Sequence, residues 1–428
     1  MLPLKTILYL SLLFGATIGS LGYHPMIGLM GYVVTYNINP AGYWWGTIPL
    51  YWGLRYSLII GIATFAGVVI HSSKLKFDKL FEGQEILLIL FLAIIWLSLL
   101  LGLGVNDGMS FAIKMSKVTI ILLLASHIIT DLHKYRILMW VLIISGLYLG
   151  YEMYNAPGGM FGEGRFQGGI GGSDFSEGNF LAAHFAMVLP FIGVMFISRG
   201  GWKSKLICLV SGAFVVNSII MTRSRGVFLA IAVGVVAAIL FSVPGKRLKI
   251  SVLLCIGLFG MFSLTDPGFW TRMETIETNE SEMDASSSGR IKAWKAALSM
   301  VNDYPLGIGV GNFVKYVGNY DPDIPGKDTH NTFFRCLSEL GIQGATVLLL
   351  LIGNAFRMLF AIRKDIDRLP NKEEFIWHVY AMQIALCIYI VAGVGLTHTY
   401  IEEFYWLLMF PVFLKRSVEN ETKINVTQ

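Results

Sequence analysis

The sequence is poor in charged residues and in cysteine. Only 14% of its 428 residues are charged, whereas about a quarter is typical of soluble domains. The four cysteines form no C-x-x-C pair, and no histidine or carboxylate stands at metal-ligating spacing to them. The sequence therefore indicates neither a disulfide framework nor a zinc site. We expect these cysteines to be small buried hydrophobic residues.

Motifs for nucleotide, metal and acyl chemistry are missing as well. The glycine-rich "YPLGIGVGNF" (304–313) follows no strand and is not closed by G-K-[ST], which favours a packing or turn role over phosphate binding. The segment "TRSRG" (222–226) lacks the G-x-S-x-G spacing of a nucleophile elbow. No D-x-D pair accompanies its arginines, so metal-assisted sugar transfer has little support. We expect neither a metal nor a cofactor.

Long apolar runs are abundant. Hydrophobic residues make up 55% of the chain, and runs such as 86–104 approach the roughly 20 residues that cross a bilayer. The sequence predicts an all-α, polytopic membrane protein with about twelve transmembrane helices. Residues 5–22 resemble a signal peptide without a cleavage site, which predicts a retained first helix. With 24–36 they form either one bent span or a pair of short helices.

The short loops alternate between basic and non-basic composition, which predicts their sidedness. Basic loops stay in the cytoplasm, and this tendency also accounts for the net charge of +5, which is no indication of nucleic-acid binding. The other loops, including 155–178, 222–226 and 265–330, are expected to face outward. The basic stretches are 71–79, 131–136, 198–205, 244–249, 363–368 and 414–416.

One long polar segment divides the chain into three parts: an N-terminal transmembrane bundle (1–264), a large outward loop (265–330), and C-terminal transmembrane helices with a cytoplasmic tail (331–428). The loop is too long for a simple connection. Its acidic run around 275–284 predicts a solvated surface. In "IKAWKAALSM" the residues Ile291, Trp294, Ala297 and Leu298 share one face, which predicts a short amphipathic helix at the membrane surface.

Arginines at outward membrane boundaries are candidates for anion binding. Arg223 and Arg225 stand in a very short loop that is expected to face outward, against the usual placement of positive charge. They either anchor helix ends or bind an anion. Arg290 follows a serine-rich run at the expected start of the amphipathic helix, where a cation does not stabilise the helix dipole. It is either a solvated loop residue or part of the same anion site.

Histidines are the candidates for proton transfer. His330 precedes an apolar run, and its neutral imidazole is a natural acceptor for a hydroxyl proton, although an interfacial hydrogen bond is the simpler role. Asp328 or Asn331 is expected to orient it. His398, with Glu402 and Glu403, is an alternative base or substrate contact. Outside these sets, Arg165 is expected to reach the same cavity, and His184 to make a structural hydrogen bond within a span.

These residues fall in motifs that resemble a known family. "TRSRGVFLA", "GRIKAWKAALSMVNDYPLGIGVGNF" and "THNTFFRCLSELGIQG" are similar to the core of the O-antigen ligase and polymerase superfamily. "INPAGYWWGTIP", "FSEGNFLAAHFAMVLP" and "FWTRMETIET" are similar to its branch of exosortase-associated O-glycosylation ligases. The family's essential arginines fall on Arg225 and Arg290 and its essential histidine on His330. Arg223 is an additional charge beside the matched position.

The resemblance implies a membrane glycosyltransferase of the bacterial inner membrane with its site facing the periplasm. Such enzymes transfer a glycan from undecaprenyl pyrophosphate to an acceptor hydroxyl without a metal. We expect Arg223, Arg225, Arg290, Arg165, Asn331 and His398 to contact the substrates. The acceptor is a glycan, a lipid A core or a protein. The alternatives are a polymerase of the same superfamily and a lipid-linked glycan flippase, but charge within the spans is scarce.

Overall fold

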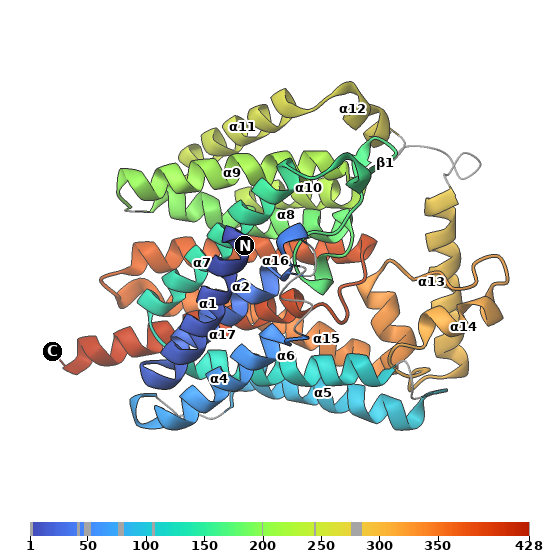
Figure 1. The fold of residues 1–428 in the computed structure, drawn as a ribbon, viewed down its shortest axis with the longest axis horizontal. Helices are drawn as coiled ribbons and strands as arrows, with labels where there is room; N and C mark the ends of the chain where they lie inside the picture. The colour runs from blue at the N-terminus through green and yellow to red at the C-terminus, as the bar shows by residue number, and fades with distance from the viewer. Residues whose placement is uncertain are drawn as a thin grey trace.

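The computed structural model describes residues 3–40, 43–46, 53–75, 81–104, 108–198, 200–243, 245–274 and 285–427. In this part of the chain nine helices are long and apolar enough to cross a membrane, and two shorter apolar helices, α4 and α10, accompany them (Figure 1). The prediction of an all-α polytopic membrane protein is confirmed. The helices of the N-terminal part are α1 (Leu4–Gly22), α2 (Pro25–Asn37), α4 (Tyr56–Ile70), α5 (Gly83–Leu101), α6 (Gly108–Ile128), α7 (Leu132–Tyr154), α8 (Gly178–Ile197), α9 (Trp202–Thr222), α10 (Arg225–Leu240) and α11 (Arg247–Leu264). The others are α12 (Pro267–Glu274), α13 (Ala285–Asp303), α14 (Phe313–Tyr320), α15 (Thr332–Asp365), α16 (Lys372–Gly395) and α17 (Glu402–Thr427).

The loops that connect the helices lie at two opposite ends of the bundle. We call the end that carries α13 and α14 the loop end, and the opposite end, near the C-terminus, the basic end (Figure 1). At the loop end the amide of Leu103 donates to the Ile308 carbonyl over 2.8 Å. At the basic end Lys415 pairs with Glu82 at 2.6 Å. Connections expected on one side of the membrane thus contact one another.

The first two helices form an antiparallel pair. His24 accepts a hydrogen bond from the Met26 amide at 3.1 Å and so caps α2, and Pro25 occupies its first turn. Lys5, at the start of α1, pairs with Glu152 in the last turn of α7 at 2.5 Å. The region thus forms two separate helices and not one bent span, and α1 is by itself long enough to cross a membrane.

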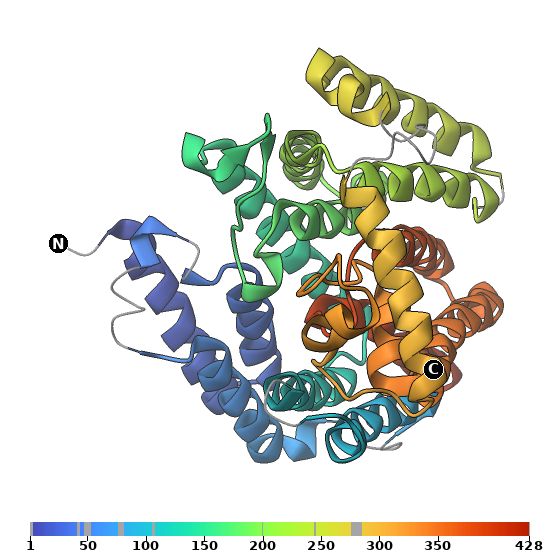
Figure 2. The same ribbon diagram turned by 90° about the vertical axis from the view of Figure 1, so that its right-hand side faces the viewer.

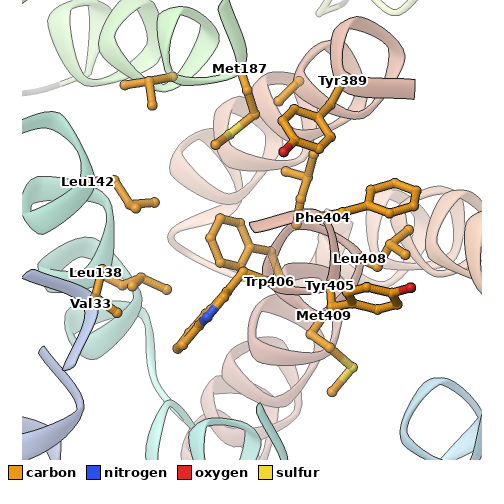
Figure 3. Packing of buried hydrophobic residues seen from close by; sticks show 14 of the residues in the cluster. Val33, Leu138, Leu142, Met187, Tyr389, Phe404, Tyr405, Trp406, Leu408 and Met409 are labelled. Carbon is orange, nitrogen blue, oxygen red and sulfur yellow. The ribbon is translucent and has the colours of Figure 1, made fainter. Parts of the chain in front are cut away.

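The packed core surrounds the first half of α17. Trp406 points toward Leu138 and Leu142 of α7 and Val33 of α2, with Met187 of α8 above it (Figure 3). The helices at the rim are far less covered. In α11, for example, only Ile250 and Met261 are buried. Such one-sided burial is what a helix facing lipid requires, because lipid chains are as apolar as the core.

The four cysteines differ in exposure. Cys208 and Cys336 are buried, Cys387 is half-buried, and Cys255 is exposed on α11. The expectation of buried hydrophobic cysteines is therefore wrong for Cys255. Because α11 presents most of its surface outward, an apolar thiol there is suited to a lipid environment.

The helix α13 lies across the loop end of the bundle (Figures 1 and 2). Its buried face consists of small residues and one methionine: Ala293, Ala296, Ala297 and Met300. These side chains pack with Phe313 and Val317 of α14 in a small separate core.

The face predicted for this helix is partly wrong. Leu298 is 47% exposed, and Ile291 is only half-buried. The alanines lie inward because they allow a close approach between helices, which leaves Leu298 to cover the outer surface. The acidic run at 275–284 lies outside the described residues.

The glycine-rich segment wraps around a kink in α15. Gly341 interrupts that helix with φ +69° and ψ −170°. The interruption frees carbonyls of the preceding turn, which must be hydrogen-bonded elsewhere at this depth. The amides of Ile308 and Gly309 donate to them at 2.9 and 3.0 Å, accepted by Ser338 and Glu339. The segment therefore has the packing role that its sequence predicts.

Candidate functional site

The short turn between α9 and α10 presents two arginines at the loop end. Arg223 ends α9 with a left-handed backbone (φ +45°), and Arg225 is the first residue of α10. The Arg223 guanidinium pairs with Asp266 at 2.6 Å and packs against the backbone at Gly268. Arg223 thus fastens the start of α12 to the end of α9.

Arg290 meets this turn at the end of α16. A Cβ atom added to Gly395 would lie 4.0 Å from Nη1 of Arg290 and 4.0 Å from Cα of Gly226. Gly226 is the neighbour of Arg225 in the chain. The guanidinium of Arg290 is therefore brought next to the first turn of α10. Residues far apart in the sequence, from α10 and α13, converge on one glycine of α16.

The position of Arg290 within α13 differs from the prediction. The helix begins at Ala285, so Arg290 lies in its second turn, and the serine-rich run is part of the helix. It therefore stands away from the helix end, and the helix dipole has little influence on it. Its place beside α10 is set by packing between helices.

His330 lies in the same region, in the loop before α15. Its backbone is left-handed (φ +45°), which is uncommon for a non-glycine residue and turns its side chain out of the path of the helix. Burial lowers the pKa of the imidazole. The charges of Arg290 and Lys327 lower this pKa further, and those of Asp328 and Glu177 raise it. The net effect is a lowered pKa, so the imidazole is neutral near pH 7.

The segment around His330 is held in place by hydrogen bonds of the neighbouring Asn331 side chain. Asn331 caps α15: its Oδ1 accepts from the amides of Phe333 and Phe334 at 2.9 and 3.0 Å. Its Nδ2 donates to the Val394 carbonyl at 3.0 Å. Sequence analysis proposed Asn331 as a substrate contact or an orienting residue. Its side chain is buried, and its amide group is engaged in these bonds.

Arg335 was missed by sequence analysis, although it holds this region together. It is 6% exposed, and it pairs with Asp328 and, at 2.7 Å, with Glu339. Glu339 also accepts from the hydroxyl of Tyr400 and the amide of Phe313 at 2.8 and 2.9 Å. The only signal in the sequence is an arginine inside an apolar run, which needs anionic partners.

The charge of Asp328 is maintained by its neighbours. Burial alone would raise the pKa of its carboxyl, but Arg335, with a hydrogen bond from Thr397, holds that pKa below its usual range. Thr397 donates to Oδ2 at 2.6 Å. Asp328 therefore remains an ion beside His330 and is bonded to the segment that leads into α17.

His398 is buried beside the start of α15, close to the loop that carries His330. It is 1% exposed, and its ring stacks on Tyr389 with centroids 4.3 Å apart. Burial lowers the pKa of His398 to about 3, so its ring is neutral. Its backbone amide donates to Oγ1 of Thr332 at 2.8 Å. The structure thus brings His398 close to the loop of His330 but covers its ring with protein.

Arg165 is presented by a small hairpin that sequence analysis did not predict. The strands Phe161–Gly162 and Arg165–Phe166 pair antiparallel across Glu163 and Gly164. These two turn residues have φ of +52° and +71°, as a two-residue hairpin turn requires. A Cβ atom on Gly164 would lie 3.1 Å from Nη1 of Arg223. Arg223 therefore lies against the hairpin turn, one residue from Arg165 in the chain.

Glu402 and Glu403 are engaged in the interior of the bundle. The Glu403 carboxylate pairs with His184 and accepts from the hydroxyl of Tyr389 at 3.0 Å. Glu402 accepts from the hydroxyl of Tyr32 at 3.1 Å. Both carboxylates, expected with His398 as an alternative base or substrate contact, are thus buried and hydrogen-bonded within the protein, and the structural hydrogen bond expected for His184 is present.

Arg290, the first turn of α10 and His330 together give this region the chemistry of an anion-binding site with a neutral base nearby. Arginines from α10 and α13 offer planar donors that match phosphate oxygens. Among the described residues no group of three or more His, Cys, Asp or Glu is arranged to hold a metal ion. The arginine side chains here can neutralise a bound anion.

Comparison with known families gives one match. Residues 209–349, about a third of the chain, match the model of a family described as O-Antigen ligase. This part of the chain is similar to that family, and it includes Arg223, Arg225, Arg290 and His330. Arg165 and His398 lie outside the matched segment. No curated protein matches the sequence.

Proposed function

We propose that the chain is a membrane glycosyltransferase of the O-antigen ligase and polymerase superfamily. It transfers a glycan from undecaprenyl pyrophosphate to an acceptor hydroxyl, with the loop end facing the periplasm of a bacterial cell. The observation that carries this proposal is the meeting of Arg290 with the first turn of α10 at Gly395, close to His330. The match of residues 209–349 supports the same class of reaction. The motifs outside that segment support kinship with the exosortase-associated branch.

The reaction is an inverting displacement at the anomeric carbon of the first sugar. As the bond to the pyrophosphate breaks, negative charge grows on the leaving oxygen, and Arg225 and Arg290 stabilise it. In other enzymes, the loss of one such preorganised donor raises the barrier by about 3–4 kcal/mol. His330, neutral near pH 7, takes the proton of the acceptor hydroxyl. Arg223 and Arg165, on the far side of the turn, contact the glycan or the lipid phosphate.

The remaining predicted residues support this arrangement. Asn331 and His398 are covered by protein; the Asn331 side chain donates to the Val394 carbonyl, and the His398 backbone amide donates to Oγ1 of Thr332. We propose that they position His330 and the start of α15. Direct contact with the substrates is left to the arginines and His330.

The test uses purified protein, a lipid-linked glycan and candidate acceptors: free glycan, lipid A core and a protein. Release of undecaprenyl pyrophosphate together with a glycosylated acceptor is the expected result. We expect Arg225→Ala, Arg290→Ala and His330→Ala each to abolish release while the protein still inserts and purifies normally. An active Arg225→Ala variant contradicts the pyrophosphate role.

The acceptor that becomes glycosylated identifies the reaction. Growth of the glycan on a second lipid-linked molecule indicates a polymerase, and transfer to lipid A core or protein indicates a ligase. Movement of the lipid across vesicles without loss of pyrophosphate contradicts the transferase and indicates a flippase.

A further inference from the structure

The two peptide units that flank His330 are both hydrogen-bonded. The unit before it contains the Thr329 carbonyl, which accepts from the indole N–H of Trp294 at 2.9 Å. The unit after it contains the Asn331 amide, which donates to Oγ1 of Thr329 at 3.2 Å. Because a peptide unit is planar, a bond at one of its atoms restrains the whole unit. The uncommon left-handed backbone of His330 (φ +45°) is therefore held on both sides.

The bond from Trp294 is the one of these two that comes from outside the loop. Thr329 is fully buried, so water does not replace the indole at its carbonyl. The other polar groups of Thr329 are bonded within the loop: its amide donates to Asp328 at 2.8 Å, and its hydroxyl donates to the Asn331 carbonyl at 3.0 Å. Trp294 thus connects α13 to the peptide unit that leads into His330.

Trp294 also lies one turn after Arg290 on α13. Residues four apart in a helix share a face, so Trp294 and Arg290 are on the same side of α13. The ring of Trp294 stacks on Phe334 in the first turn of α15, with centroids 5.4 Å apart and planes at 21°. One side chain therefore docks the helix of Arg290 against α15 and bonds to the backbone of the His330 loop.

We propose that Trp294 is a positioning residue of this site: its indole N–H fixes the peptide unit before His330 and so aims the imidazole at the acceptor hydroxyl. The proposal rests on the proposed function. The stacked ring attaches α13 to α15, whereas the N–H orients the base, and substitutions can separate the two roles. Orientation matters because a displacement of about 1 Å can cost about 100-fold in rate.

Two substitutions separate the N–H from the ring in the lipid-linked glycan assay. Trp294→Phe removes the donor but keeps an aromatic ring against Phe334. Its kcat should fall by about 10–100-fold, because the base loses its fixed orientation. Its KM for the lipid-linked glycan should stay within about twofold, because the arginines remain in place. Phe334→Leu weakens the stacking but keeps the N–H, so its kcat should stay within about twofold of the wild type.

A matched control removes an indole donor elsewhere in the bundle. Trp96 on α5 donates to Oγ of Ser116 on α6, also at 2.9 Å. Trp96→Phe should leave kcat unchanged. A wild-type kcat in Trp294→Phe overturns the proposal, as do equal losses in Trp294→Phe and Phe334→Leu. A higher KM for the lipid-linked glycan in Trp294→Phe also overturns it, because α13 would then have moved together with Arg290.

A measurement without turnover separates this proposal from the proposed function. Threonine precedes histidine at two places in the sequence, Thr329–His330 and Thr397–His398. Protein labelled with carbon-13 at threonine carbonyls and nitrogen-15 at histidine therefore gives one carbon–nitrogen correlation for each pair in solid-state NMR, and His330→Gln assigns them.

The Thr397 signal is the internal reference in this spectrum. In Trp294→Phe the Thr329 carbonyl signal should shift, because carbonyl shifts respond to hydrogen bonding, and the Thr397 signal should stay in place. Movement of both signals or of neither overturns the proposal. If the wild type releases no pyrophosphate with any acceptor, the proposed function fails on that result, while the spectrum still decides whether Trp294 holds the His330 peptide.

Discussion

Replacing Arg335 by methionine tests how the segment before α15 is held. The change keeps the length of the side chain but removes the cation between Asp328 and Glu339, both of which remain as carboxylates. Glu339 is fully buried. Breaking a buried ion pair from one side costs about 3–5 kcal/mol, because the remaining charge is left without its partner. Asp328 keeps its bonds from Thr397 and Thr329, so we take the lower figure of about 3 kcal/mol.

Cys336 is a built-in reporter of this loss, because it follows Arg335 in the chain and is fully buried. A maleimide reaches its thiol only when the start of α15 opens locally. A loss of about 3 kcal/mol raises the opened population, and with it the labelling rate, by about two orders of magnitude. The assay is labelling of purified protein in which Cys255 and Cys387, the more accessible cysteines, are replaced by serine.

Cys208 is the internal control for this experiment. It is buried in α9, away from the ion pair. Its labelling rate should not change in Arg335→Met. Equal acceleration of Cys208 and Cys336 would mean global loosening of the bundle, and an unchanged Cys336 would refute the reasoning about the buried pair.

Further predictions concern three glycines and the side-chain cap of α15. Gly395→Ala should retain transfer activity because its Cβ has 4.0 Å of clearance from Arg290, whereas Gly395→Val should lower activity at least tenfold without a change in thermal unfolding. Gly307→Ala should destabilise the protein by about 1–3 kcal/mol in denaturant unfolding, because its Cβ would lie 2.4 Å from a backbone oxygen of α15 at φ +92°. Gly326→Ala, at φ +73° in open space, should cost only about 1 kcal/mol. Asn331→Ala should cost about 1–2 kcal/mol through loss of the helix cap. Asn331→Asp should not recover this loss, because its buried carboxylate accepts from the first-turn amides but cannot donate to the Val394 carbonyl.

The helices were largely predictable from the sequence, because each span needs a long apolar run whatever its neighbours are. The run at 86–104, for instance, ends within a few residues of α5 (Gly83–Leu101). The face that each helix buries was not predictable in the same way. Lipid and protein core are equally apolar, so the hydrophobic pattern does not separate them. The exposed Leu298 shows a related limit at the surface, where alanines pack inward for reasons of shape.

The candidate site was predictable only as a set of separate residues. Arg225, Arg290 and His330 stand out because charge is rare at membrane boundaries. The approach of Arg290 to the first turn of α10 at Gly395 depends on how α10, α13 and α16 pack, which no local pattern encodes. Arg335 was missed although its ionic partners Asp328 and Glu339 are near in sequence, because the pattern around it does not show that its side chain is buried.

The contact at Gly395 also orders events in time during synthesis. Arg225, Arg290 and His330 are all translated before α16, yet the glycine that brings Arg290 to α10 is the last residue of that helix. The nascent chain therefore carries every proposed reacting group before it has the geometry to use them. Insertion of α16 into the membrane is then the step that assembles the site, and a ribosome-bound chain that stops after α15 is expected to be inactive.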